Sequence, residues 1–277
     1  MKTTEAPSRP DAQARLRRIE GRHNALVKQL RRAFTQSELT ADGHCAIEGL
    51  RIVEEAIRSG LKFRAVFFSE SAATKADRLL PQIGAHAETL LLPDALFASA
   101  VPTETPQGIA ALVKPKTYKW EDVLSRSSAG PLVAVAGVQD PGNLGTILRS
   151  AEAFGAAGAL LGEGTVSQFN SKAVRASAGS VFRLPIARAD LEAVVPELRE
   201  RGLRLIATSS HKGTPLPEAN LTLPLALFIG NEGAGLPRDL LAKIDELIAI
   251  PHSPRVESLN AGVAASIILY AAAQQRK

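Results

Sequence analysis

The chain has 277 residues, of which 45% are hydrophobic, and its 33 lysines and arginines outnumber its 28 acids, a formal net charge of +5. This length favours two domains, and the single cysteine, Cys45, excludes a disulfide framework and a paired-cysteine metal or redox site. The polar N-terminus lacks the apolar core of a signal peptide, and the most apolar later stretch, from Ala261 to Ala273, is too short to span a bilayer. We therefore expect a soluble, cytoplasmic protein without a membrane partner, and the positive charge favours a polyanionic one.

The first part of the chain predicts a small α/β domain over residues 15–114. Residues 1–14 are polar and contain two prolines, which indicates disorder. Apolar residues recur near helical spacing from Leu16 to Phe34, and Ala46 to Gly49 leads into a second helix that is expected to end at Gly60. The other expected elements are a helix from Pro93 and strands at Ala65–Phe68, Ala87–Leu92 and Gly108–Val113.

Basic residues crowd the first segment of this domain. Glu20 is the only nearby acid, and the basic residues are Arg15, Arg17, Arg18, Arg22, Lys28, Arg31 and Arg32. A solvated helix face explains such a cluster as well as contact with RNA phosphates does. The candidate RNA contacts are Arg22, Lys28, Arg31 and Arg32, with Arg175 from the second half.

Residues 115–130 are expected to form a linker, after which the pattern alternates regularly. Apolar strands are predicted at Leu132–Val138, Gly158–Leu161, Leu203–Thr208, Leu225–Ile229 and Glu246–Ile250. Helices are predicted between them, at Leu144–Phe154, Ser171–Ala178, Leu191–Arg201 and Pro237–Lys243, with a last one from about Ser258. This alternation predicts a parallel sheet covered on both faces over residues 131–277, with ligands bound beyond the carboxyl ends of its strands.

A first polar motif follows the first of these strands. Residues 140–142, Asp-Pro-Gly, form a turn, and Asn143 is expected to cap the next helix. The apolar stripe of that helix leaves Arg149 off the core side, where it suits a phosphate or carboxylate at the strand ends. The alternative is a surface arginine that pairs with Glu152.

A glycine-rich loop, residues 228–237, forms the second motif. Gly230, Gly233 and Gly235 allow a ligand to approach the backbone closely, as in a dinucleotide-binding oxidoreductase. Glu232 within the loop would repel a pyrophosphate, which disfavours that class. A cofactor with a positive centre, such as the sulfonium of S-adenosylmethionine, tolerates this charge. A plain strand-to-helix turn explains the glycines but not the acid.

The third motif runs from Ile250 to Ala264. A strand end enters a proline-rich loop and then a helix expected to be capped near Ser258. Ser258 and Asn260 offer a hydroxyl and an amide at the same strand-end cleft. An ordinary helix cap accounts for Ser258 and leaves Asn260 unexplained.

Taken in this order, the three motifs resemble the signatures of the TrmH, or SpoU, class of the SPOUT superfamily of RNA methyltransferases. The matching residues are Asn143 and Arg149, Glu232, and Ser258 with Asn260. Residues 171–180 and 105–109 also resemble this family, and the N-terminal half is similar to its ribosomal-protein-like (L30e-type) substrate-binding domain. One departure is Pro254, where the family usually has a glycine.

The resemblance implies a trefoil-knotted catalytic domain, a homodimer with active sites near its interface, and S-adenosylmethionine as cofactor. It implies catalytic roles for Arg149, Asn143, Glu232, Ser258 and Asn260. Cofactor contacts would come from the backbone of Gly230, Ile250 and Leu259, with Thr208 and Ser209 nearby. Arg149 is proposed in the family to activate the hydroxyl, yet guanidinium is a poor base, so it is equally suited to hold a phosphate and stabilise an alkoxide.

The function that the resemblance implies is methylation of a ribose 2′-hydroxyl, with 23S ribosomal RNA as the favoured substrate and no metal. The five histidines, at positions 23, 44, 86, 211 and 252, lack ligand spacing. The alternatives are a non-catalytic RNA-binding ribosome-assembly factor, and an enzyme that acts on transfer RNA or confers antibiotic resistance.

Overall fold

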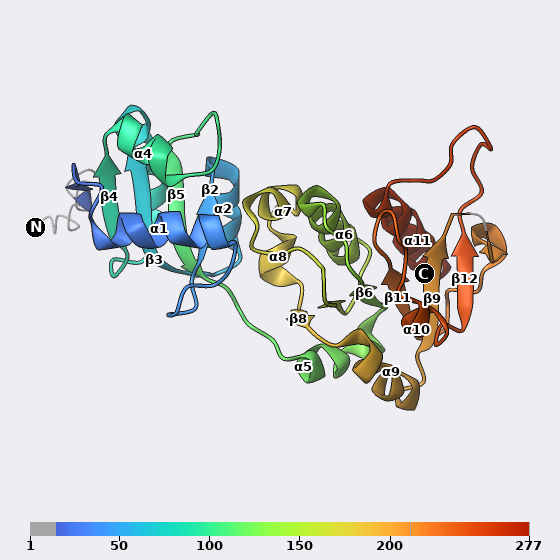
Figure 1. Cartoon of the computed structure of the whole chain (residues 1–277). Helices are drawn as coiled ribbons and strands as arrows, with labels where there is room; N and C mark the ends of the chain where they lie inside the picture. The colour runs from blue at the N-terminus through green and yellow to red at the C-terminus, as the bar shows by residue number, and fades with distance from the viewer. Residues whose placement is uncertain (1–14, 211, 277) are drawn as a thin grey trace, which may run out of the picture. The chain divides into compact units, whose positions relative to one another are not determined.

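The computed structural model describes residues 15–210 and 212–276, and the chain divides into two compact units, Met1–Pro115 and Lys116–Lys277 (Figure 1). The segment predicted to be disordered, residues 1–14, lies outside the described residues. Among the described helices, none combines the length and the apolar character that a membrane span requires.

The N-terminal unit contains a five-stranded mixed sheet in the order β1-β4-β3-β5-β2. Its strands are β1 (Arg17–Arg18), β2 (Cys45–Glu48), β3 (Lys62–Ser69), β4 (Glu88–Leu92) and β5 (Ile109–Lys114). The strand β5 runs antiparallel to both of its neighbours, β2 and β3. The helices are α1 (Ala25–Gln36), α2 (Leu50–Arg58), α3 (Ala76–Leu79) and α4 (Asp94–Ala100).

One face of this sheet packs against α1 and α4. The α1 side chains Leu26 and Leu30 join Phe67 of β3, Leu90 of β4 and Phe97 of α4 in one buried cluster. Burial of such side chains stabilises a helix far more than its own propensity does.

Two sequence predictions for this unit were wrong. The first helix begins at Ala25 and not at Leu16, because the Asn24 side chain caps it by accepting hydrogen bonds from the N–H groups of residues 26 and 27. The two residues of β1 instead extend the sheet beside β4. Residues 45–48 form a strand, β2, where only the lead-in to a helix was expected, because pairing with β5 buries all four residues.

The C-terminal unit contains a seven-stranded sheet in the order β10-β12-β9-β11-β6-β7-β8. Every neighbouring pair is parallel, which confirms the predicted parallel sheet. Its strands are β6 (Leu132–Val135), β7 (Gly158–Leu161), β8 (Ile186–Arg188), β9 (Arg204–Ser209), β10 (Thr214–Pro215), β11 (Leu225–Ile229) and β12 (Glu246–Ala249). The strands β6, β7 and β11 are fully buried, as expected for a sheet covered on both faces.

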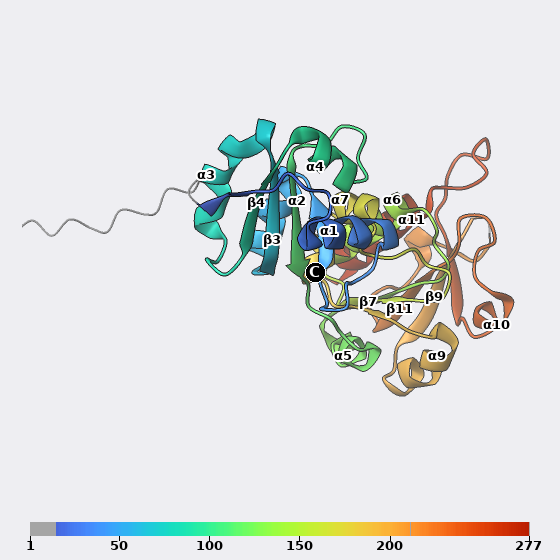
Figure 2. The ribbon, with the colours of Figure 1, turned by 60° about the vertical axis from the view of Figure 1, so that its left-hand side comes forward.

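Seven α-helices of this unit are described: α5 (Trp120–Leu124), α6 (Pro141–Ala153), α7 (Ser171–Ala176), α8 (Ser180–Arg183), α9 (Leu191–Glu200), α10 (Arg238–Leu241) and α11 (Ala261–Gln275). Figure 2 shows the same elements from a second side. The helices α6 and α11 pack together, with the hydroxyl oxygens of Ser150 and Ser266 2.6 Å apart and the rings of Phe154 and Tyr270 5.6 Å apart. Residues 115–130, where a linker was expected, include α5, whose Val123 and Leu124 are buried in the core of the C-terminal unit.

Several predicted boundaries in this unit need correction. The short strands β8 and β10 were not predicted, and the helix expected at residues 171–178 ends at Ala176, where a turn precedes α8. The last helix starts at Ala261 and is capped by Asn260 rather than near Ser258. The mixed α/β class is confirmed, whereas the implied trefoil knot stays a prediction.

Candidate active site

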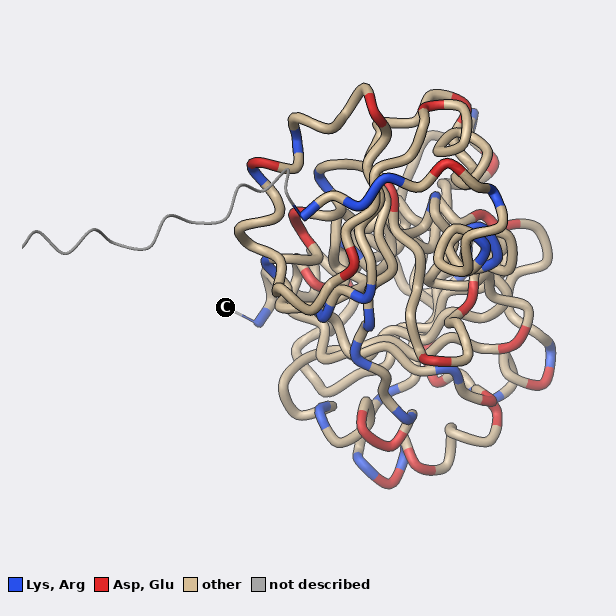
Figure 3. The backbone as a smooth tube through the Cα atoms, turned by 90° about the vertical axis from the view of Figure 1, so that its left-hand side faces the viewer, with Lys and Arg blue, Asp and Glu red and all other residues tan. Residues whose placement is uncertain are grey.

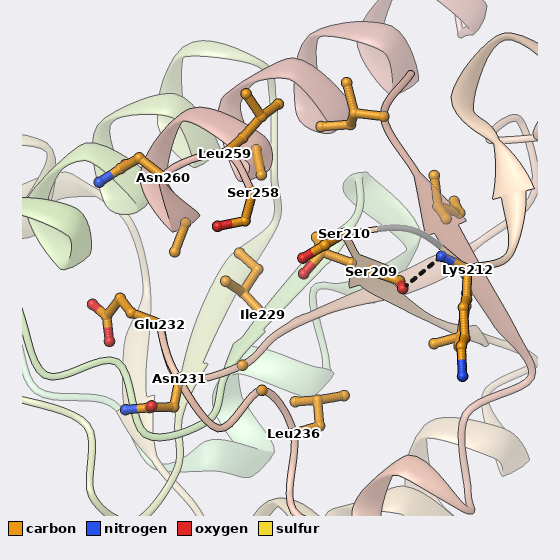
Figure 4. A pocket seen from close by; sticks show the side chains of 18 of the residues that line it. Ser209, Ser210, Lys212, Ile229, Asn231, Glu232, Leu236, Ser258, Leu259 and Asn260 are labelled. Carbon is orange, nitrogen blue, oxygen red and sulfur yellow. Dashed lines mark hydrogen bonds between the residues drawn. The ribbon is translucent and has the colours of Figure 1, made fainter. Parts of the chain in front are cut away.

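The three motif segments meet beyond the carboxyl ends of β11, β12 and β9. A cavity of about 540 Å³ opens there (Figure 4). Its walls come from the loop after β11 (residues 230–236), the segment after β12, the end of β9 and the first turn of α11. Parallel strands bring these distant segments to one edge of the sheet because all their carboxyl ends point the same way.

Eight of the ten residues predicted to be catalytic or cofactor-binding line this cavity. They are Thr208, Ser209, Gly230, Glu232, Ile250, Ser258, Leu259 and Asn260. The exceptions are Asn143, which contacts two of the lining side chains, and Arg149, which does not line the cavity. Figure 4 shows Glu232 and Asn260 at one end of the cavity and Lys212 at the other.

A chain of hydrogen bonds joins the three motifs through Asn143. The Asn143 amide nitrogen donates to Oε1 of Glu232 at 2.9 Å, and the amide nitrogen of Asn260 donates to Oδ1 of Asn143 at 2.7 Å. Asn143 is only 9% exposed, so its amide is held by these partners rather than by water. The arrangement fixes the positions of three polar groups that lie up to 117 positions apart in the sequence.

Backbone groups complete the surroundings of the Glu232 carboxylate. The N–H groups of Gln139 and Asp140 donate to Oε2 and Oε1 of Glu232, each at 3.3 Å. Partial burial raises the pKa of Glu232, but hydrogen bonds from the Asn143 amide and from backbone N–H groups outweigh it and hold that pKa below its ordinary value. Glu232 is therefore a carboxylate at neutral pH, as the sequence argument required.

Asn143 and Asn260 differ from the predictions in their capping roles: Asn143 does not cap its helix, and Asn260 does. The N-cap of α6 is Asp140, whose Oδ1 accepts from the N–H of Asn143 at 2.9 Å, so the Asn143 side chain is left for Glu232 and Asn260. Asn260 both caps α11, by accepting from the N–H of Val263 at 3.1 Å, and donates to Asn143. This dual use explains why the sequence places an asparagine at position 260 rather than any other capping residue.

Asn231 shapes the glycine loop and was not singled out from the sequence. Its amide nitrogen donates to the carbonyl of Gly137, and its Oδ1 accepts from the N–H groups of Gly233 and Ala234. A Cβ at Gly230 would lie 2.4 Å from the carbonyl carbon of Gly235, so only glycine fits there. The signal that would have found Asn231 is an asparagine directly before a Glu-Gly pair, a common site of side-chain-to-backbone turns.

Arg149 is exposed on α6, and no hydrogen bond or ion pair joins it to another described residue. The alternative pairing with Glu152 is not formed, because Glu152 accepts from Nε and Nη2 of Arg183 at 2.6 and 2.9 Å. Arg149 follows Asn143 by six residues, which is roughly 9 Å along the helix axis. Its guanidinium is thus available to a group outside its own chain.

The candidate RNA contacts are exposed except Arg31, which is half-buried. Arg22 lies shortly before α1, Lys28 is on the exposed side of α1, and Arg175 is exposed on α7. Arg31 donates to the backbone carbonyl and the hydroxyl of Ser99, and Arg32 donates to Gln36 within the same helix. The basic cluster is therefore divided between structural contacts and open charges.

Residues 130–270 match the SpoU rRNA Methylase family, and residues 24–111 match an MRM3-like substrate binding domain. The chain belongs to the SpoU rRNA methylase family. The predicted resemblance is confirmed, and the protein is an RNA methyltransferase of the SpoU class. The nucleotide-dependent oxidoreductase is excluded as its class.

Relatives in this family are similar over almost the whole chain. The 23S rRNA (guanosine(2553)-2′-O)-methyltransferase RlmP of Bacillus subtilis (strain 168) is 34% identical over 255 residues, which cover 92% of this chain and 98% of that protein. An AdoMet-bound rRNA methyltransferase from Sinorhizobium meliloti has a TM-score of 0.81 and 28% identity, over 94% of this chain and 98% of that one. The SpoU methyltransferase AviRb from Streptomyces viridochromogenes, also with AdoMet, has a TM-score of 0.75 and 27% identity, over 91% and 99%.

Proposed function

We propose that this SpoU methylase transfers a methyl group from S-adenosylmethionine to a ribose 2′-hydroxyl of 23S ribosomal RNA. The observation that carries the proposal is the hydrogen-bonded chain from Glu232 through Asn143 to Asn260 at one end of the strand-end cavity. The named activity of the Bacillus subtilis relative supports the ribose 2′-oxygen and the 23S RNA. The methyl donor is S-adenosylmethionine, which is the ligand of both structural relatives.

The cavity suits this cofactor in size and in chemistry. A volume of about 540 Å³ lies within the range of small-molecule sites. Apolar side chains such as Ile229, Leu236 and Leu247 offer faces for an adenine ring, and the serine hydroxyls of residues 209 and 210 offer polar partners. The Glu232 carboxylate at one end suits a sulfonium, which supplies the methyl group when the cofactor is bound.

The residues of the chain position the reacting groups and leave little to move during the reaction. Asn143 and two backbone N–H groups hold the Glu232 carboxylate in place, so its charge is preorganised. Ser258, close to Asn260 on the same wall, offers a hydroxyl for the incoming ribose. Alignment of a nucleophilic oxygen with the donor methyl is the main contribution such a site makes.

Arg149 reaches the site from a second copy of the chain in this proposal. It does not line its own cavity, and its guanidinium has no partner among the described residues. The neighbouring helix α11 exposes Val263 at 46% and Tyr270 at 50%, one apolar stripe seven residues apart, which favours a homodimer interface along α6 and α11. Arg149 of the partner subunit then contacts the phosphate or the developing alkoxide, which suits a guanidinium better than proton removal does.

Mixed dimers test this sharing of residues. An Arg149→Ala chain and a Glu232→Ala chain are each inactive alone, but their mixture regains about a quarter of wild-type activity if Arg149 acts across a symmetric interface, since half of the dimers carry one complete site. A mixture that stays inactive while forming dimers places Arg149 at the cavity of its own chain and contradicts the proposal.

The non-catalytic alternative makes a different prediction for cofactor binding. A binding-only ribosome-assembly factor has no need of the cavity and should show no heat of binding with S-adenosylmethionine in calorimetry. Mapping of 2′-O-methyl groups in ribosomal and transfer RNA from a deletion strain separates the favoured 23S substrate from transfer RNA. Loss of a 23S methyl group is the expected result, and loss of one from transfer RNA alone overturns the choice of substrate.

A further inference from the structure

The N-terminal unit carries a second group of cations, apart from α1, at one end of its sheet. Lys62 at the start of β3 is directly opposite Lys114 at the end of β5 in the antiparallel register. Both side chains are exposed, and Arg64 is exposed two residues further along β3. We call Lys62, Arg64 and Lys114 the β3–β5 basic row.

His44 lies next to this row, just before the strand β2. It directly precedes Cys45, which pairs with Val113, so it lies beside Lys114. Burial lowers the pKa of His44, and the charges of Lys114 and Arg64 lower it further against the opposing effect of Asp42. The electrostatic surroundings of this histidine are therefore net positive.

The row differs from the ion-paired arginines of this unit in lacking carboxylate partners. Arg17, Arg18 and Arg78 form ion pairs with Glu88, Glu70 and Glu54, whereas none of the three row residues forms an ion pair with a described residue. Like charges directly opposite each other on a sheet are destabilising. Protection of a sheet edge does not account for Lys114, because β5 is paired on both sides.

We propose that the β3–β5 basic row binds the phosphate backbone of the RNA substrate. This inference rests on the proposed function, because ribosomal RNA supplies the polyanion. Phosphates that lie across the row would relieve the repulsion between Lys62 and Lys114, so the unfavourable pair becomes favourable only in the complex. The row thus adds a contact surface to the arginines and lysine of α1 that the sequence indicates.

The test compares two triple variants of equal charge. The row variant is Lys62→Gln, Arg64→Gln and Lys114→Gln, and the matched control is Arg17→Gln, Arg18→Gln and Arg78→Gln, which removes three ion-paired cations from the same unit. The full-length proteins are titrated with a 23S ribosomal RNA transcript at several salt concentrations. We expect the row variant to bind at least about tenfold more weakly and to flatten the slope of log K against log salt by about 2, with little change in the control.

The outcomes separate the two proposals. Equal RNA affinities and salt slopes for the row variant and the control would overturn the proposal that the row binds RNA. Weaker RNA binding by the row variant, with its S-adenosylmethionine affinity unchanged, supports the proposal. A separate Lys62→Arg, Lys114→Arg variant keeps the charges and should bind RNA as the wild-type protein does. Failure of the wild-type protein to methylate the transcript counts against the proposed function and leaves the binding comparison intact. Tighter binding to a polyglutamate probe than to RNA, lost in the row variant, would assign the row to an acidic protein partner instead.

Discussion

The hydrogen-bonded side chains of Glu232, Asn143 and Asn260, here called the Glu232 network, contrast with the β3–β5 basic row. The charge in the first cluster has partners within the chain, and the charges in the second do not. In the network, the carboxylate of Glu232 accepts from an amide and two backbone N–H groups, so its position is fixed within the chain. In the row, Lys62 faces Lys114 without a carboxylate partner. The first cluster is preorganised by the chain itself, whereas the second gains its balancing charge only from a ligand.

This difference suggests a way to interpret exposed polar residues. A side chain whose hydrogen bonds end within the chain, such as Asn143, positions other groups. A cation without a partner, such as Arg149 or Lys62, has its partner elsewhere. Variants of both kinds of residue test this distinction.

Replacement of Arg149 should have the largest effect. Arg149→Ala is expected to lower kcat by about 10²–10³-fold, because the site loses a donor aimed at developing charge, and to leave S-adenosylmethionine affinity nearly unchanged. Steady-state methyl transfer and calorimetry measure the two quantities. Arg201→Ala, which removes an arginine that pairs with Glu197 at the C-terminal end of α9, is the control and should retain activity. Full turnover by the Arg149 variant would remove this residue from the mechanism.

Disruption of the network should have an intermediate effect. Asn143→Ala leaves Glu232 and Asn260 without their shared partner, a cost of about 1–3 kcal/mol, and should lower kcat/KM by about 10- to 100-fold. The double variant with Asn260→Ala should be little worse than Asn143→Ala alone, because the two side chains act as one unit. Additive losses in the cycle would show that the hydrogen bond between them carries no function.

The pH dependence of stability isolates Glu232. Its pKa is below the ordinary value in the folded chain, so its contribution to stability is complete above the unfolded-state pKa and is lost as the pH falls through the folded-state pKa. Wild-type protein should therefore lose thermal stability more steeply between neutral and acidic pH than Glu232→Gln does. Parallel curves for the two proteins would contradict the described contacts of the carboxylate.

The smallest effect is expected in the row. Without RNA, Lys62→Gln should raise the Tm of the protein by about 1–4 °C at low salt, because it removes a like-charge pair. Added salt should raise the wild-type Tm toward that of the variant, since it screens the same repulsion. Arg78→Gln serves as the control and should not raise the Tm, because Arg78 is paired with Glu54.

The parallel sheet and most of the site could be predicted because they depend on local patterns. Runs of apolar residues mark β6, β7 and β11, and motif residues directly after strands must lie at one edge of a parallel sheet. The strand β2 was missed because its four residues are recognisable only through pairing with β5. Whether Asn260 or Ser258 caps α11 depends on where the proline-rich loop ends and the helix begins. In the structure Asn260 is the cap and also donates to Asn143, a tertiary contact that the local sequence does not reveal.

The basic row was invisible for a related reason. Lys62 and Lys114 are 52 positions apart, and only the register of β3 against β5 brings them opposite each other. The position of Arg149 outside its own cavity likewise follows from the packing of α6 beside α11, which periodicity alone does not reveal. Sequence patterns thus identified the polar residues and the strand ends. Strand register and helix packing determine which of those residues lie opposite one another.

The most direct test of the central claim is transfer of a labelled methyl group by the purified protein. S-adenosylmethionine carrying the label is incubated with a 23S ribosomal RNA transcript, and the RNA is digested to nucleosides for identification. We expect label in a single 2′-O-methylated nucleoside, and about a hundredfold less or lower still with the Arg149→Ala protein. Label on a base, or no incorporation by wild-type protein that binds both cofactor and RNA, would contradict it.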